Sequence, residues 1–131
     1  MSLRFAGYAA LFDLPDGARD VIRPGAFSAT LAQRTGPLPI YWQHRPDQSI
    51  GVVEHAAEDT RGLRVIARID NPQSRSASLL KTGAVSGLSF GYRVRRAQHG
   101  ITGRVIEALD LFEISLVTHP LQHGARVHLV S

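Results

Sequence analysis

The chain has 131 residues, of which 44% are hydrophobic and 20% charged, and it contains no cysteine. This length and composition predict a single globular domain over residues 1–131, and the lack of cysteine excludes disulfides, thiolate metal ligands and a cysteine nucleophile. The formal net charge is +4, but the basic residues are spread out without interleaved aromatics, so nucleic acid is not the expected partner. Neither a membrane helix nor a signal peptide is recognisable, so membrane association and secretion are not expected.

The first half of the chain is predicted to contain four strands and one short helix. Residues 4–12 are apolar with an internal glycine, which is typical of a buried strand. A helix of two to three turns is expected next, from Ala26 to its closing Gly36. A strand should follow, in which alternate residues from Leu38 to His44 share one face and which Pro46 ends. Two runs rich in Val and Ile, residues 49–56 and 62–69, then predict a hairpin.

The second half is predicted to contain a helix and three strands. The helix spans residues 74–83, with Ser74 or Ser76 as its cap and Gly83 at its end. The strand containing Ser89 follows, and residues 97–103 are expected to form a loop. Residues 104–118 are apolar enough for a helix, although alternation in their second half favours a strand. With a last short strand at 125–130, the fold class is mainly β, a closed or partly open antiparallel barrel of about seven strands with short helices.

The segment GAVSGLSFGYR, residues 83–93, contains a serine with room to react. Alternation along a strand turns Leu88 and Phe90 to the core and Ser89 away from it. Gly87 and Gly91 flank Ser89 on its own face, so another backbone could approach its hydroxyl. The match to G-x-S-x-G does not indicate an α/β hydrolase, because a strand rather than a helix follows. Two other serines compete less well: Ser86 has core-facing parity, and Ser115 has Glu113 and Val117 beside it.

A reactive serine requires a base, which at neutral pH is usually histidine. Six histidines are present, and His44 is favoured because it lies at the rim of the predicted barrel. An acidic third residue would orient the imidazole. Glu113, a carboxylate in the middle of the strand FEISLV, fits that part.

Several segments together resemble the prohead maturation protease family of tailed phages, which is similar in fold to the herpesvirus assemblins. They are RFAGYAALFD, DVIRPGAFSATL, YWQHRPDQSIGVV, GLRVIARI, GAVSGLSFGYRV and LFEISLVTHP, in this order along the chain. The resemblance implies a serine protease with His44 as base, Ser89 as nucleophile and Glu113 as third member. Herpesvirus relatives use histidine as third member, which makes His119 the alternative. No metal or cofactor is implied.

The resemblance also implies a task, which is to cleave scaffold or delta segments of the major capsid protein, and the protease itself, inside the assembling prohead in the host cytoplasm. A homodimer or higher oligomer is a further expectation, since herpesvirus relatives dimerise. The alternative is a catalytically degenerate, scaffold-like assembly protein with the same barrel. Residues 120–124 are the expected source of oxyanion donors, and the end at Ser131 suggests trimming, self-processing or reliance on another contact for entry into the shell.

Overall fold

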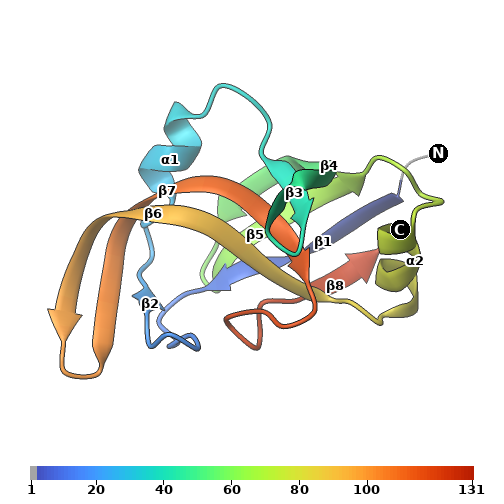
Figure 1. Ribbon diagram of the computed structural model, residues 1–131. Helices are drawn as coiled ribbons and strands as arrows, with labels where there is room; N and C mark the ends of the chain where they lie inside the picture. The colour runs from blue at the N-terminus through green and yellow to red at the C-terminus, as the bar shows by residue number, and fades with distance from the viewer. Residues whose placement is uncertain (1–2) are drawn as a thin grey trace.

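The computed structural model describes residues 3–131, which form eight strands and two short helices (Figure 1). Their order is β1 (Leu3–Leu11), β2 (Val21–Ile22), α1 (Ser28–Gln33), β3 (Pro39–Trp42), β4 (Arg45–Glu58), β5 (Gly62–Ile69), α2 (Arg75–Thr82), β6 (Gly87–Gly100), β7 (Gly103–Val117) and β8 (Val127–Val130). The mainly β fold class is therefore confirmed. The strand beyond the predicted seven is β2, a two-residue element whose sequence is too short to carry a pattern.

The strands form one strongly curved sheet in the order β2-β7-β3-β4-β5-β1-β8, with β6 on the other edge of β7. Most neighbours are antiparallel, as predicted, and β2 and β3 are exceptions that run parallel to β7. The sheet is not closed. Between β8 and β6 the described residues form a single bridge, Gly87 with Arg126, and the hydrogen bonds of Leu88 N–H to Ala125 O and Val127 N–H to Ser86 O.

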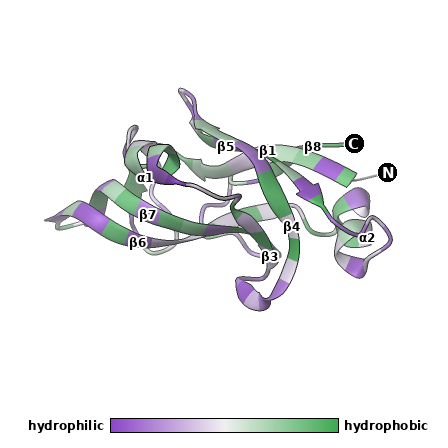
Figure 2. Cartoon of the chain, turned by 90° about the horizontal axis from the view of Figure 1, so that it is seen from above, coloured by the Kyte–Doolittle hydropathy of each residue, from purple (hydrophilic) through white to green (hydrophobic). Residues whose placement is uncertain are grey.

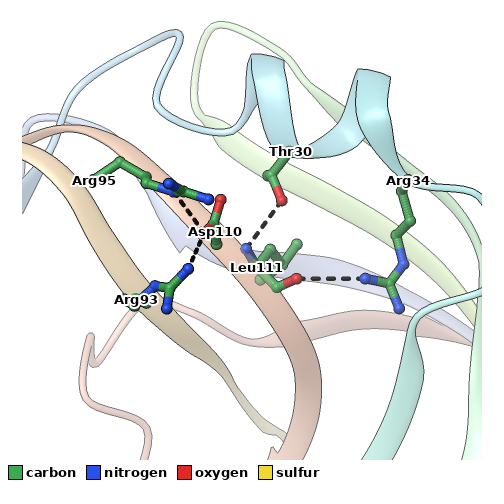
Figure 3. Close-up of polar contacts among 6 residues, drawn as sticks. All are labelled: Thr30, Arg34, Arg93, Arg95, Asp110 and Leu111. Atoms are coloured by element: carbon green, nitrogen blue, oxygen red, sulfur yellow. Dashed lines mark hydrogen bonds and ion pairs between the residues drawn. The ribbon is translucent and has the colours of Figure 1, made fainter.

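Strand β7 is the central element, because it pairs with three other strands along its two edges. One edge pairs with β6 over most of its length. On the other edge β2 and β3 cover the two ends, and α1 covers the middle. There the backbone N–H of Leu111 donates to Thr30 Oγ1 at 3.0 Å, and Arg34 donates to Leu111 O at 3.4 Å (Figure 3). Side chains from α1 and from Arg34, the residue after it, thus complete the hydrogen bonding that no strand supplies at this point.

Helix α2 confirms its predicted caps. The Ser74 hydroxyl accepts a hydrogen bond from Ala77 N–H, and Gly83 ends the helix with φ of 79°, the left-handed conformation that glycine adopts most easily. Helix α1 is shorter than predicted and ends at Gln33, ahead of Gly36. Its first turn has no side-chain cap of its own. Instead, the distant carboxylate of Glu58 accepts hydrogen bonds from the N–H groups of Gly25 and Phe27.

Two predicted boundaries were wrong because polar residues continue strands. Residues 97–103 are not a loop: β6 runs to Gly100 and β7 starts at Gly103, which makes one long hairpin that projects from the body of the molecule (Figure 1). The projecting end is largely hydrophilic (Figure 2). A two-stranded ribbon in solvent needs no apolar face, so its sequence reads as a loop. Likewise, Pro46 does not end a strand but lies near the start of β4.

The core lies inside the curved sheet. Its fully buried side chains come from nearly all strands and from the segment before α1, and the largest are Phe5, Phe27, Ile22, Ile40, Leu63, Ile69, Leu88, Ile106, Leu109, Ile114 and Leu116. The strand predicted for the second half of residues 104–118 is confirmed, and β7 extends it back to Gly103, so no helix forms there. Within residues 3–131, neither helix has the length or the apolar character that crossing a bilayer would require.

Candidate active site

The register of β7 with its two neighbours brings the predicted site residues to one region. Across the antiparallel β6–β7 ladder, Ser89 is the partner of Ser115 and Gly91 is the partner of Glu113. On the other side of β7, the end of β3 runs parallel to it, with Trp42 opposite Leu116. His44 follows Trp42 by two residues. The three predicted catalytic residues, distant in the sequence, are therefore carried by β6, by β7 and by the turn that follows β3.

His44 lies in a tight turn rather than at a strand end as predicted. Trp42 and Arg45 are paired across the β3–β4 hairpin, so Gln43 and His44 form a two-residue loop. Both have positive φ, 53° and 61°, as the mirror-image turn of such hairpins requires. The predicted alternation along 38–44 thus fails after Trp42, because the chain reverses direction there.

The imidazole of His44 is hydrogen-bonded to the carboxylate of Glu113, with Nδ1 and Oε1 2.6 Å apart. An ionised carboxylate only accepts, so Nδ1 carries the hydrogen and Nε2 keeps a free lone pair. This hydrogen bond raises the pKa of His44; burial opposes the shift and the negative charge of Glu113 adds to it. The Glu113 side chain is 9% exposed and the His44 side chain 44%, so the carboxylate is buried and the imidazole faces solvent.

Ser89 is 9% exposed. The predicted core face of β6 is confirmed, because Leu88 belongs to the core and Phe90 and Tyr92 pack against it. Among the described residues, the Ser89 hydroxyl makes no hydrogen bond to a side chain, and in particular none to His44. Every fully buried side-chain oxygen or nitrogen among those residues has a hydrogen-bond partner. The hydroxyl therefore keeps contact with solvent and remains available.

The two glycines beside Ser89 make room for parts of this protein. A Cβ on Gly91 would stand 2.5 Å from Glu113 Oε1, and a Cβ on Gly87 would stand 2.7 Å from Cδ of Pro120. The predicted space above the strand is thus occupied, on one side by the Glu113 carboxylate and on the other by the segment that follows β7. Gly87 and Gly91, where these two contacts are made, are the neighbours of Ser89 on its own face of the strand.

Of the competing candidates, only Ser115 is hydrogen-bonded to the His44–Glu113 pair within the described residues. His119 is exposed, and in the described part of the chain its ring makes no hydrogen bond. The Ser86 hydroxyl accepts a hydrogen bond from Arg126. The third serine, Ser115, is fully buried and hydrogen-bonded to Glu113 and to the backbone of His44. Its part in the site was missed, and its alternation with Glu113 two residues earlier was the only signal. Residues 3–131 contain no group of three or more metal-ligating side chains arranged to hold an ion.

Comparison with curated proteins finds relatives from two phages. It is 33% identical over 130 residues to the prohead protease of Enterobacteria phage HK97, covering 94% of this chain and 58% of that protein. It is 30% identical over 124 residues to a capsid polyprotein of Pseudomonas phage PAJU2, covering 86% of this chain and 18% of the polyprotein. The chain thus spans less than two thirds of the curated relatives it matches.

Solved structures of herpesvirus proteases share the fold. A KSHV protease in complex with a hexapeptide phosphonate inhibitor superimposes with a TM-score of 0.71 at 18% identity, over 100% of this chain and 65% of that one. Varicella-zoster virus protease gives a TM-score of 0.51 at 20% identity, over 85% and 58% of the two chains. The family model described as Caudovirus prohead serine protease matches residues 1–131. The chain therefore belongs to the family of Caudovirus prohead serine proteases.

Proposed function

We propose that the chain is a serine endopeptidase in which Ser89 is the nucleophile, His44 the general base and Glu113 the residue that orients His44. The observation that carries the proposal is the hydrogen bond of 2.6 Å between His44 Nδ1 and Glu113 Oε1, made beside a strand whose Ser89 faces away from the core. To act as a base, His44 needs an unprotonated Nε2, and a carboxylate that accepts the hydrogen of Nδ1 fixes that tautomer.

The reaction would proceed through an acyl-enzyme. Ser89 Oγ attacks the scissile carbonyl carbon while His44 Nε2 takes the hydroxyl proton, and Glu113 stabilises the imidazolium that forms. His44 then gives the proton to the leaving amine as the C–N bond breaks. A water molecule, activated by His44 in the same way, hydrolyses the ester and returns Ser89 to its starting state.

The proposal requires Ser89 and His44 to come within hydrogen-bonding reach when substrate binds. Catalytic hydrogen bonds are often long or misaligned without substrate and tighten in the complex, and the His44 side chain is 44% exposed, so that substrate can reach it. The oxyanion donors are proposed to be backbone N–H groups of residues 120–124. The contact of Pro120 with Gly87, two residues before Ser89, supports this position.

The proposed substrate is the major capsid protein, at its scaffold or delta segment, together with the protease itself, inside the assembling prohead in the host cytoplasm. The names of the two relatives support this, since one is a prohead protease and the other a capsid polyprotein. Self-association is proposed as well, because one KSHV protease of the same fold binds a dimer disruptor. Sedimentation of the purified chain over a range of concentrations measures it, and a constant monomer mass up to the highest concentration would contradict it.

The decisive experiment is co-expression of the chain with its capsid precursor, followed by mass spectrometry of the termini produced. Ser89→Ala should lower the cleavage rate by at least about 10³-fold, as expected for loss of a nucleophile. Ser86→Ala is the matched control on the same segment and should cleave normally. Undiminished cleavage by Ser89→Ala would overturn the proposal. Glu113→Ala should lose far more rate than His119→Ala, and the reverse order would assign the third position to His119.

Labelling with a serine-directed phosphonate separates this function from a scaffold-like protein without activity. An activated serine reacts covalently, whereas an ordinary hydroxyl does not. We expect stoichiometric labelling of Ser89 and none of Ser86. A folded protein that stays unlabelled would favour the scaffold-like alternative.

A further inference from the structure

The turn that carries the proposed base has a backbone conformation that its own residues do not favour. Gln43 and His44 both have left-handed φ values, 53° and 61°. In two-residue hairpin loops of this kind, glycine, asparagine and aspartate are the usual residues. A glutamine followed by a histidine therefore needs support from the surrounding structure to keep this conformation.

Gln43 attaches the turn to the end of β7. Its backbone N–H donates to Leu116 O at 3.0 Å. Its side-chain Nε2 donates to Thr118 Oγ1 at 2.6 Å, and its Oε1 accepts from Thr118 N–H at 3.2 Å. The side-chain amide thus makes two hydrogen bonds beyond the point where the β3–β7 ladder stops. Three hydrogen bonds hold one residue of the turn against β7.

Ser115 attaches the other residue of the turn. Its side chain is fully buried. Its Oγ accepts the backbone N–H of His44 at 3.2 Å and donates to Glu113 Oε2 at 2.5 Å. The other oxygen of the same carboxylate accepts from His44 Nδ1. The backbone of His44, the Ser115 hydroxyl, the Glu113 carboxylate and the His44 ring therefore form a closed ring of hydrogen bonds.

We infer that Ser115 and Gln43 are positioning residues that hold the His44 turn and the Glu113 carboxylate in one fixed arrangement on β7. Ser115 is also the register partner of Ser89, so the same residue fixes the position of the base relative to the strand that carries the nucleophile. This inference rests on the proposed function, since it assumes that His44 is the base. Neither residue touches the reacting atoms: Ser115 acts through Glu113 and the His44 backbone, and Gln43 acts through the turn.

The test compares Ser115→Ala and Gln43→Ala with matched controls. Ser76→Ala also removes the hydroxyl of a buried serine, but in α2, and Gln98→Ala also removes a glutamine that bonds across two strands, in the projecting hairpin. We expect kcat on a cleavable peptide to fall about 10- to 100-fold in Ser115→Ala and about 10-fold in Gln43→Ala, the range for displaced catalytic groups. KM should stay within about twofold, because neither side chain binds substrate. The controls should keep their kcat.

A second measurement needs no substrate and separates positioning from stability. The His44 ring is titrated by NMR in each folded variant. Without the Ser115 hydroxyl, the carboxylate and the turn are no longer held together, so the His44–Glu113 hydrogen bond forms for less of the time. The midpoint of the His44 titration should then move down toward that of an ordinary histidine. Ser115→Thr keeps a hydroxyl and should recover the wild-type midpoint wherever it folds.

The inference is overturned if Ser115→Ala and Gln43→Ala keep both the wild-type kcat and the wild-type midpoint of His44. It is also overturned if their loss of kcat only follows a loss of folded protein, as thermal unfolding of the variants and controls would reveal. Failure of the proposed function has a different signature, which is undiminished cleavage by Ser89→Ala. The titration of His44 can still confirm or contradict the positioning role in that case.

Discussion

Replacing Gly91 by alanine should disconnect Glu113 from His44 while leaving the fold intact. The new Cβ would stand 2.5 Å from Glu113 Oε1 and 3.0 Å from its Cδ and Cγ, whereas ordinary contacts begin at 3.4 Å. The carboxylate must therefore move by about 0.9 Å, which is enough to stretch the bond of 2.6 Å to His44 Nδ1 out of the strong range. The obstructing atoms all belong to the Glu113 side chain and none to the backbone, so the side chain can give way while the strand stays in place.

The expected loss is about 10²-fold in kcat/KM, the typical effect of misplacing a catalytic group by about 1 Å. The assay is cleavage of a peptide taken from the capsid processing site, combined with thermal unfolding. Gly36→Ala is the matched control, because a Cβ there would meet nothing within 4 Å, and it should keep full activity. If Gly91→Ala cleaves within about threefold of wild type, the carboxylate at 113 does not orient the base and the reasoning is refuted.

Two further predictions concern pH and stability. The pKa of His44 is raised by Glu113, so the acid limb of kcat/KM should lie above the ordinary histidine pKa of about 6.5. The same His44–Glu113 pair stabilises the fold fully below the ordinary histidine pKa, and this contribution is lost as pH rises through the folded pKa of His44. Glu113→Gln should move the limb down, and an unchanged limb would assign it to another group. Asp20 is 4% exposed and bound twice by Arg104, at 2.7 and 3.0 Å, so Asp20→Asn should cost about 1–3 kcal/mol in urea unfolding. Because Arg104 keeps the pKa of Asp20 low, that difference should shrink as pH falls through the folded pKa of Asp20, and a cost independent of pH would contradict the role of the charge.

Elements with local signals were predictable from the sequence. Helix α2 has Ser74 and Gly83 at its ends, and both residues act through hydrogen bonds or conformations that depend on residues nearby. The alternation around Ser89 likewise gave the correct face of β6, because one side of that strand is fully buried at Leu88. In these cases the local pattern and the tertiary structure favour the same answer.

The remaining features depend on contacts between distant residues. Nothing near His44 indicates a left-handed turn, since its support comes from Ser115 and Thr118 on another strand. The parallel pairing of β3 with β7 has no sequence signature of its own. Gly91 was predicted to leave space, and only the register of β6 with β7 reveals that Glu113 occupies it.

The position of Glu113 and Ser115 on a strand paired along both edges has a consequence for which length changes the chain tolerates. From Glu113 to Val117 the ladder with β6 runs without a register shift, so inserting or deleting one residue there would turn the side chains beyond it to the other face. At the hairpin tip, residues 101–102 are exposed, and an insertion there leaves the register below unchanged. Among relatives, length variation should therefore concentrate at the tip and be excluded from residues 113–117.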